Sequence, residues 1–182
     1  MTPIPDLFIL IPTVYEDKRG YFFESYNHQV FKSLGIKDLF VQDNQSKSVY
    51  GVIRGLHYQL EPYAQSKLVR VLYGKILDVA LDIRIGSPTF GKYFAVELSD
   101  INKKQLYIPR GFAHGFSVLS DEAIVLYKTD NFYNKEAERG ILYNDPSLGI
   151  DWKIPIEKQI VSEKDAKNPT FDNLETNFFY KK

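Results

Sequence analysis

Histidine is the side chain best suited to acid–base chemistry at neutral pH, and this chain has three histidines and no cysteine. His57 lies in the segment Gly51–Gln59, where it shares strand parity with Gln59 and follows Arg54 by three residues. A histidine in this setting can accept a proton from a substrate, and it can equally be a hydrogen-bonded structural residue. The local spacing alone favours the structural role.

The other two histidines differ in their surroundings. His114 lies between Gly111 and Gly115, and glycines allow the backbone to approach another group closely. The local sequence favours a satisfied turn histidine, and a ligand contact is the alternative. His28 has no partner motif around it, so we expect it at the surface.

A metal centre needs clustered ligands, and small β-barrels that bind iron or manganese usually offer two histidines one residue apart with a nearby carboxylate. Neither His57 nor His114 has a second histidine at that spacing, and the chain has no cysteine to supply a thiolate. We therefore expect no metal site, and a metal-dependent oxygenase is disfavoured.

Basic residues stand on or beside predicted strands: Arg54, Lys67 and Arg70. A buried cation is costly unless an anion pairs with it, and a diphosphate could do so through charge-assisted hydrogen bonds. A solvated face of the sheet is the alternative. Gln42 and Asn44 share one strand face, which suits hydrogen bonds to a polyhydroxyl ligand or to a neighbouring strand.

Two further residues carry groups that could move or hold a proton. Tyr127 shares strand parity with Ala123 and Val125, which predicts an inward hydroxyl that needs a partner. Asp165 lies three residues after Ser162, the spacing of a helix-capping box. The local sequence alone favours structural roles for both residues.

Short runs with period-two alternation dominate the middle of the chain and predict strands. In Lys75–Arg84 the odd positions from Leu77 to Ile83 are apolar and the even ones include Asp78 and Asp82, which predicts a half-buried strand. Gly74 separates this segment from Lys67–Tyr73, so we expect the two to form a hairpin. The other predicted strands are Phe40–Ser46, Gly51–Gln59, Tyr93–Leu98, Gln105–Ile108, Gly115–Leu119 and Ala123–Thr129.

Helices are expected to be few and short. Asn27 could cap one that ends near Gly35, and Ser162 could cap another. The tail Thr170–Lys182 is expected to be loop-like and to pack on the body or on a partner. Because many evenly spaced short strands are typical of sandwiches and small barrels, residues 1–182 are predicted to form a single all-β domain with antiparallel strands.

The composition excludes several classes of protein. The 182 residues include 23 Lys plus Arg and 23 Asp plus Glu, a formal net charge of zero that argues against general nucleic-acid binding. The segment Met1–Pro12 lacks a basic region and is a poor signal peptide, and no apolar run approaches the ~20 residues that span a bilayer. We expect a cytoplasmic protein that binds neither nucleic acid nor membrane.

Segments along nearly the whole chain together resemble the dTDP-4-dehydrorhamnose 3,5-epimerase family, in the family's order and at its approximate spacing. They are Asp17–Glu24, Gln42–Ser46, Gly51–Gln59, Ala64–Val71, Ser87–Gly91, Tyr107–Phe116, Leu126–Lys128, Asn144–Pro146 and Val161–Asp165. The resemblance implies a cupin-type β-sandwich or jelly-roll barrel, a homodimer with shared active sites, and no metal or organic cofactor.

The resemblance also implies roles for individual residues. It implies that His57 is the catalytic base and that Tyr127 is the proton donor on the opposite face. Asp165 is implied to orient the base, and Lys67 to stabilise an enolate oxygen. The substrate-binding residues that it implies are Arg19, Glu24, Gln42, Asp43, Asn44, Arg54, Lys67, His114, Glu138 and Lys164. The first two of these are implied to reach into a site shared between dimer partners.

The reaction implied by the resemblance inverts C3 and C5 of dTDP-4-dehydro-6-deoxy-D-glucose and gives dTDP-4-dehydro-L-rhamnose. Both carbons flank the C4 ketone, so their protons are acidic through enolate formation, and inversion needs a base on one face and an acid on the other. A relative that inverts C3 alone would use the same groups and is the alternative. A catalytically silent cupin that only binds a nucleotide sugar is disfavoured, because base, donor and orienting carboxylate are all present.

Overall fold

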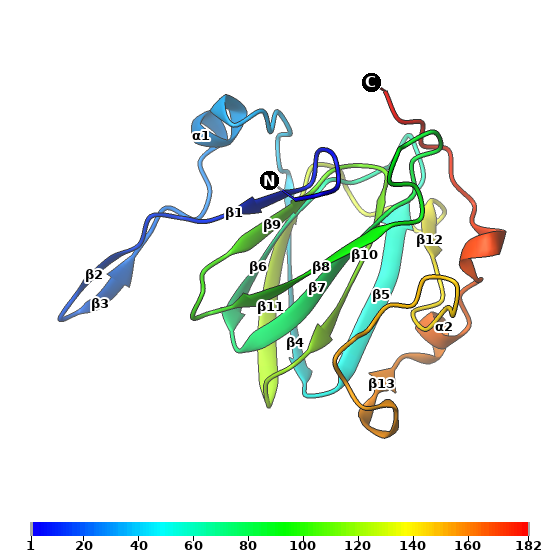
Figure 1. Cartoon of the computed structure of the whole chain (residues 1–182). Helices are drawn as coiled ribbons and strands as arrows, with labels where there is room; N and C mark the ends of the chain where they lie inside the picture. Colours follow the sequence, from blue (N-terminus) through cyan, green and yellow to red (C-terminus); the bar gives the residue numbers. More distant parts are fainter. Residues whose placement is uncertain (1, 182) are drawn as a thin grey trace.

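Two antiparallel β-sheets pack face to face in the computed structural model, which describes residues 2–181 (Figure 1). In the first sheet the strand order is β1 (Phe8–Leu10), β9 (Gln105–Ile108), β6 (Lys67–Tyr73), β11 (Glu122–Thr129) and β4 (Gln42–Val49). In the second sheet it is β12 (Glu138–Gly140), β5 (Val52–Gln59), β10 (Phe112–Val118), β7 (Lys75–Asp82) and β8 (Tyr93–Ser99), and β13 (Ile160–Val161) runs parallel beside β5. The predicted fold class, an all-β cupin-type antiparallel sandwich with a few short helices, is confirmed.

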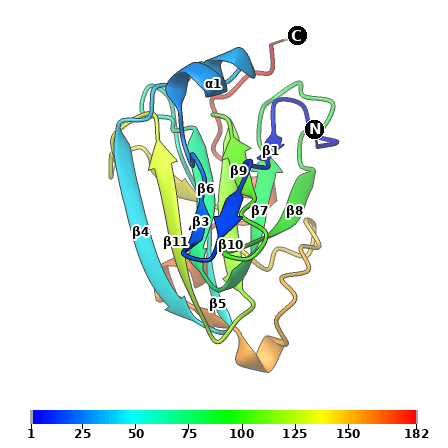
Figure 2. The ribbon, with the colours of Figure 1, turned by 90° about the vertical axis from the view of Figure 1, so that its left-hand side faces the viewer.

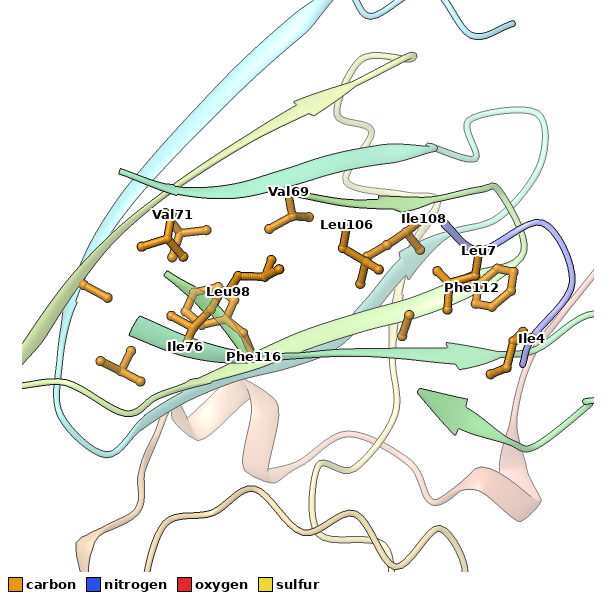
Figure 3. Packing of buried hydrophobic residues seen from close by; sticks show 14 residues of the cluster. Ile4, Leu7, Val69, Val71, Ile76, Leu98, Leu106, Ile108, Phe112 and Phe116 are labelled. Atoms are coloured by element: carbon orange, nitrogen blue, oxygen red, sulfur yellow. The ribbon is translucent and has the colours of Figure 1, made fainter. Parts of the chain in front are cut away.

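The interior between the sheets is filled by aliphatic and aromatic side chains from both layers. Burial of this apolar surface is the main source of stability, and close packing fixes the spacing of the two sheets. Side chains at the edge of the cluster, such as that of Tyr127, are therefore held at a defined separation from the opposite sheet. The members labelled in Figure 3 are Ile4, Leu7, Val69, Val71, Ile76, Leu98, Leu106, Ile108, Phe112 and Phe116.

The predicted hairpin on either side of Gly74 is wrong. Strand β6 pairs with β9 and β11 in the first sheet, whereas β7 pairs with β10 and β8 in the second. Gly74 has a φ of +78°, and a Cβ added there would collide with the carbonyl oxygen of Glu122. The chain crosses from one sheet to the other at this residue, in a conformation and a space that suit only glycine.

The prediction that β7 is half-buried is also wrong, because both of its faces are covered. Its odd positions from Leu77 to Leu81 pack against Ile141, Trp152 and Phe178 of the C-terminal region. Its even positions face the other sheet, and there Asp78 and Asp82 are both 0% exposed. Alternation of polar and apolar residues in β7 therefore marks a buried polar network and not contact with solvent.

Both predicted helix caps are confirmed. The side chain of Asn27 accepts two backbone N–H groups of the first turn of α1 (His28–Ser33), which lies beyond one end of the first sheet (Figure 2). The hydroxyl of Ser162 accepts the backbone N–H of Asp165 in α2 (Glu163–Ala166). None of the helices within residues 2–181 has the length and apolar character that crossing a membrane requires.

The C-terminal region packs on the body of the sandwich, as predicted for the tail. It contains the short 3-10 helices η1 (Ile156–Lys158) and η2 (Phe171–Asn173), and Phe179 forms an isolated bridge with Ile85. Phe178 is buried. The final residue of the predicted tail, Lys182, lies outside the described residues.

The hairpin formed by β2 (Tyr15–Asp17) and β3 (Gly20–Phe22) projects away from the sandwich (Figure 1). Its residues are exposed throughout, and the large apolar side chain of Phe22 is 70% exposed. This hairpin was not predicted, because strands of three residues are too short to show a period in the sequence.

Candidate active site

A pocket of about 640 Å³ opens between the two sheets. Strands β4, β6 and β11 of the first sheet contribute to one wall, and β5 and β10 of the second sheet contribute to the other. β13 and α2 complete the lining. The predicted site residues that the structure brings together here are Asn44, Arg54, His57, Lys67, His114, Tyr127, Lys164 and Asp165.

His57 and Asp165 form a close pair at the second-sheet wall. The distance between His57 Nε2 and Asp165 Oδ1 is 2.7 Å, and Asp165 Oδ2 accepts the backbone N–H of Gly55 at 3.2 Å. Only glycine fits at position 55, because a Cβ there would collide with the backbone of Gly115 on the neighbouring strand. Asp165 therefore does both things that the sequence left open: its backbone is capped by the N-cap serine of α2, and its carboxylate holds the histidine.

The electrostatics of this pair favour a charged carboxylate. Burial pushes the pKa of Asp165 upward, but the hydrogen bonds from His57 and Gly55 outweigh burial and hold that pKa below its ordinary value of 3.8. The His57 ring is one-third exposed, at 32%, and lines the pocket with Nε2 turned to the carboxylate. Its other nitrogen, Nδ1, is then the one left to act on a bound molecule.

Tyr127 stands on the opposite wall. It lies on β11 of the first sheet, whereas His57 lies on β5 of the second, and both line the same pocket. Burial raises the pKa of the Tyr127 phenol, and the positive charge of Arg54 only partly opposes this effect. The phenol is therefore protonated at neutral pH and can donate a proton into the pocket.

Lys67 brings a positive charge between these two residues. Its Nζ donates to the backbone carbonyl oxygen of His57 at 3.4 Å and lies 6.0 Å from the ring centroid of Tyr127. Burial lowers the pKa of Lys67 to about 8, and the carboxylates of Asp78 and Glu138 act in the opposite direction. At neutral pH the charged ammonium form of Lys67 predominates, so this side chain can stabilise a negative oxygen.

His114 forms a second histidine–carboxylate pair, directly beside the first. It is opposite His57 in the β10–β5 register, and its Nε2 lies 2.7 Å from Oδ1 of Asp78. Burial lowers the pKa of His114 in spite of the neighbouring carboxylate. A neutral His114 can therefore offer a polar edge to a ligand but is a weaker base than its ordinary pKa would make it.

Cationic side chains gather at the pocket. The Nε of Arg54 donates to the hydroxyl of Ser48 at 3.1 Å, which orients the guanidinium group. The Nζ of Lys164 forms a 2.5 Å ion pair with Glu138, which also accepts the hydroxyl of Tyr133 at 3.0 Å. Arginine and lysine in such positions match the phosphate groups of a nucleotide ligand.

Five predicted binding residues lie outside the pocket lining of this chain, and one of them, Glu138, contacts the lining through its ion pair with Lys164. Gln42 donates at 3.0 Å to the side chain of Asn44, which itself lines the pocket. Asp43 forms an ion pair with Lys128 at 2.8 Å. The two remaining residues, Arg19 and Glu24, lie on and beside the projecting hairpin, and Arg19 has a side chain that is 84% exposed.

Three residues that hold side chains of the site were not predicted: Asp78, Ser48 and Tyr133. Asp78 and Ser48 act on neighbouring side chains through the interior, so only the sheet register brings them to the site. Among residues 2–181, no group of three or more His, Asp or Glu side chains is arranged to hold a metal ion.

Comparison with known proteins identifies the family. The family model described as dTDP-4-dehydrorhamnose 3,5-epimerase matches residues 1–173. The chain belongs to the dTDP-4-dehydrorhamnose 3,5-epimerase family. A curated dTDP-4-dehydrorhamnose 3,5-epimerase from Shigella flexneri is 58% identical to it over 171 residues, which cover 93% of each chain. The predicted family and the predicted enzyme class, an isomerase acting on carbohydrates, are confirmed.

Solved structures of dTDP-4-dehydrorhamnose 3,5-epimerases share the fold of this family member. The crystal structure from Elizabethkingia anophelis NUHP1 has a TM-score of 0.92 and 56% identity, with 95% of each chain covered. The dTDP-6-deoxy-D-glucose-3,5-epimerase from Legionella pneumophila Philadelphia 1, solved in complex with dTDP-4-keto-L-rhamnose, has a TM-score of 0.92 and 49% identity. That comparison covers 96% of this chain and 92% of the Legionella chain.

Replacing Asp165 with Asn should reduce the free energy of unfolding at neutral pH by about 1–3 kcal/mol, because buried charged hydrogen bonds are lost. The folded-state pKa of Asp165 is depressed, so the contribution of its carboxylate is present above the unfolded-state pKa and disappears as the pH falls through the folded-state pKa. The difference between wild type and Asp165→Asn should therefore narrow as the pH is lowered below 3.8.

Urea unfolding at a fixed protein concentration, from about pH 7 to about pH 3, measures this difference. The matched control is Asp172→Asn, since Asp172 is exposed, and it should change stability by less than about 0.5 kcal/mol at any pH. A gap between wild type and Asp165→Asn that stays constant across the whole pH range would contradict the assignment.

Proposed function

We propose that this chain inverts C3 and C5 of dTDP-4-dehydro-6-deoxy-D-glucose to give dTDP-4-dehydro-L-rhamnose, with His57 as base and Tyr127 as acid. One observation carries the proposal: the two residues come from opposite sheets and line the same pocket. Inversion at a carbon requires proton removal from one face and proton return on the other, and this arrangement supplies a group for each face.

The proposed sequence of proton transfers begins at Nδ1 of His57, the nitrogen not bound by Asp165. It removes the proton from the carbon beside the ketone, and the electron pair moves onto the ketone oxygen to form an enolate. The ammonium group of Lys67 stabilises that oxygen, and the carboxylate of Asp165 stabilises the imidazolium. Tyr127 then delivers its phenolic proton to the same carbon from the other face. Proton exchange with solvent restores both groups for the second carbon.

The binding part of the proposal rests on the cations at the pocket. Arg54 and Lys164 are held by neighbouring side chains in positions suited to the diphosphate. Asn44 offers an amide to sugar hydroxyls, and His114 offers its ring edge. The reaction proposed for these residues involves no metal or organic cofactor.

Inversion of C3 alone is the less supported alternative. The chemistry at C3 and C5 needs the same groups, so the site geometry does not separate them. The relatives that share 50–58% of their residues with this chain are named 3,5-epimerases, and this favours inversion of both carbons.

Incubation with dTDP-4-dehydro-6-deoxy-D-glucose in D2O, followed by NMR, tests the reaction and the two roles. Wild type should introduce deuterium at both C3 and C5 and form inverted product. His57→Ala should abolish exchange, because no base remains. Tyr127→Phe should still exchange deuterium but form little inverted product, because the proton can return only from the side of His57.

Deuterium at C3 alone would favour the C3-only reaction, and no exchange in the wild-type enzyme would contradict both versions. The matched control for the tyrosine is Tyr50→Phe, since Tyr50 lies outside the pocket lining, and it should behave as wild type. Inverted product at the wild-type rate from Tyr127→Phe would show that another residue is the acid.

We further propose that the protein is a homodimer in which Arg19 and Glu24 of each chain complete the site of the other. The exposed projecting hairpin and the apolar groove beside β1 and α1 support this proposal, because exposed apolar surface of this kind is typical of interfaces.

We also propose that residues 1–182 form a single domain, and that it acts in the cytoplasm. The charged diphosphate of the proposed substrate confines that substrate to the compartment in which it is made.

A mixing experiment tests the shared site. Arg19→Ala and His57→Ala should each be nearly inactive alone. After the two variants are mixed at equal concentration and allowed to exchange subunits, about one quarter of wild-type activity should return, since half of the dimers are mixed and each has one intact site. No recovery in a mixture that size-exclusion chromatography and mass analysis show to contain mixed dimers would contradict the proposal.

A further inference from the structure

The carboxylate of Asp78 is the most deeply buried charge beside the pocket. It lies at the centre of β7, on the face toward the first sheet, and is 0% exposed. Its Oδ1 binds His114 at 2.7 Å, but Oδ2 has no hydrogen-bond partner within the described residues. A buried carboxylate oxygen without a donor is costly, so its retention in this position calls for a functional reason.

The charges around Lys67 indicate that reason. His57 from β5 and Tyr127 from β11 contact it, and it interacts electrostatically with Asp78 from β7, His114 from β10 and Glu138 from β12.

Among these groups, the two carboxylates favour the charged lysine. Glu138 is already bound by Lys164 and Tyr133. Asp78 is bound by a histidine that burial keeps toward its neutral form, so its negative charge is not cancelled by that partner. Asp78 therefore supplies negative charge that other cations have not neutralised.

We propose that Asp78 is a positioning residue for the reaction: its buried carboxylate keeps Lys67 charged and available to the enolate oxygen, and it holds His114 with Nε2–H turned inward. This inference rests on the proposed epimerisation. The carboxylate does not touch the substrate and acts through Lys67.

The charge state of Lys67 depends on its burial and on the carboxylate of Asp78. Burial alone would favour the uncharged amine, and an uncharged amine stabilises an enolate oxygen poorly. With Asp78 present the pKa of Lys67 is about 8, so the ammonium form predominates at neutral pH. Removing the carboxylate lowers that pKa further, and the charged fraction falls in the pH range where the enzyme works.

The variant Asp78→Asn removes the charge and keeps both the size of the side chain and an acceptor for His114. We expect kcat to fall by about tenfold or more, with the ~10²–10³-fold loss seen when an oxyanion stabiliser is removed as the upper bound, and KM to change by less than about threefold. The alkaline limb of the kcat profile should move to lower pH. In a Lys67→Met background the same substitution should have little further effect on kcat, because the lysine through which Asp78 acts is absent.

Asp82→Asn is the matched control. Asp82 lies on the same strand and is also 0% exposed, but its charge is paired with Arg84 at 2.8 Å and it does not line the pocket. This control should leave the alkaline limb in its wild-type position. Thermal unfolding identifies which variants are folded, and Asp78→Ser, which brings no buried amide donors, carries the test if Asp78→Asn does not fold.

An unshifted alkaline limb in a folded Asp78 variant would overturn the inference, as would a full multiplicative loss of kcat in the Lys67→Met background. These outcomes differ from failure of the proposed function, in which wild type itself shows no exchange at C3 or C5. Wild-type exchange together with an unshifted limb rejects the role of Asp78 alone.

Discussion

The contact between His57 and Asp165 is the interaction on which the site depends. The two residues are 108 positions apart, and their side chains meet at 2.7 Å. Several features of the fold serve this contact: the parallel pairing of β13 with β5 brings α2 to the second sheet, and Ser162 fixes the first turn of that helix. Gly55 then supplies a backbone N–H to the second carboxylate oxygen, so that the ring has one defined partner and one free nitrogen.

The sandwich supplies the second requirement of the proposed reaction, which is a group on each face of the reacting carbon. Two facing sheets place His57 and Tyr127 on opposite walls, and the apolar cluster beside them fixes the separation of those walls. The same interior contains Lys67, Asp78 and His114, whose burial lowers stability but strengthens their electrostatic effect on one another. Perturbed ionisable groups gathered in one pocket are typical of an active site.

Local sequence could predict the strands of four or more residues, both helix caps and the sandwich class, because these depend on alternation and on capping residues within a few positions. It could not predict that Gly74 carries the chain between sheets, since the pairing of β6 and β7 is decided by partners distant in sequence. Nor could it recognise Asp78 as a buried charge, because a polar residue in an alternating strand looks the same whether it faces water or another sheet. Spacing alone favoured structural roles for His57 and Asp165, and only the resemblance to a family proposed the catalytic ones.

The state of the His57 ring is the most direct test of this account. The 15N chemical shifts of the imidazole, measured by NMR on labelled enzyme at a pH where the ring is neutral, report which nitrogen carries the proton. We expect the tautomer with the proton on Nε2, bound to Asp165, and an unprotonated Nδ1 facing the pocket. A neutral ring protonated on Nδ1 would leave the base without a lone pair toward the substrate and would contradict it.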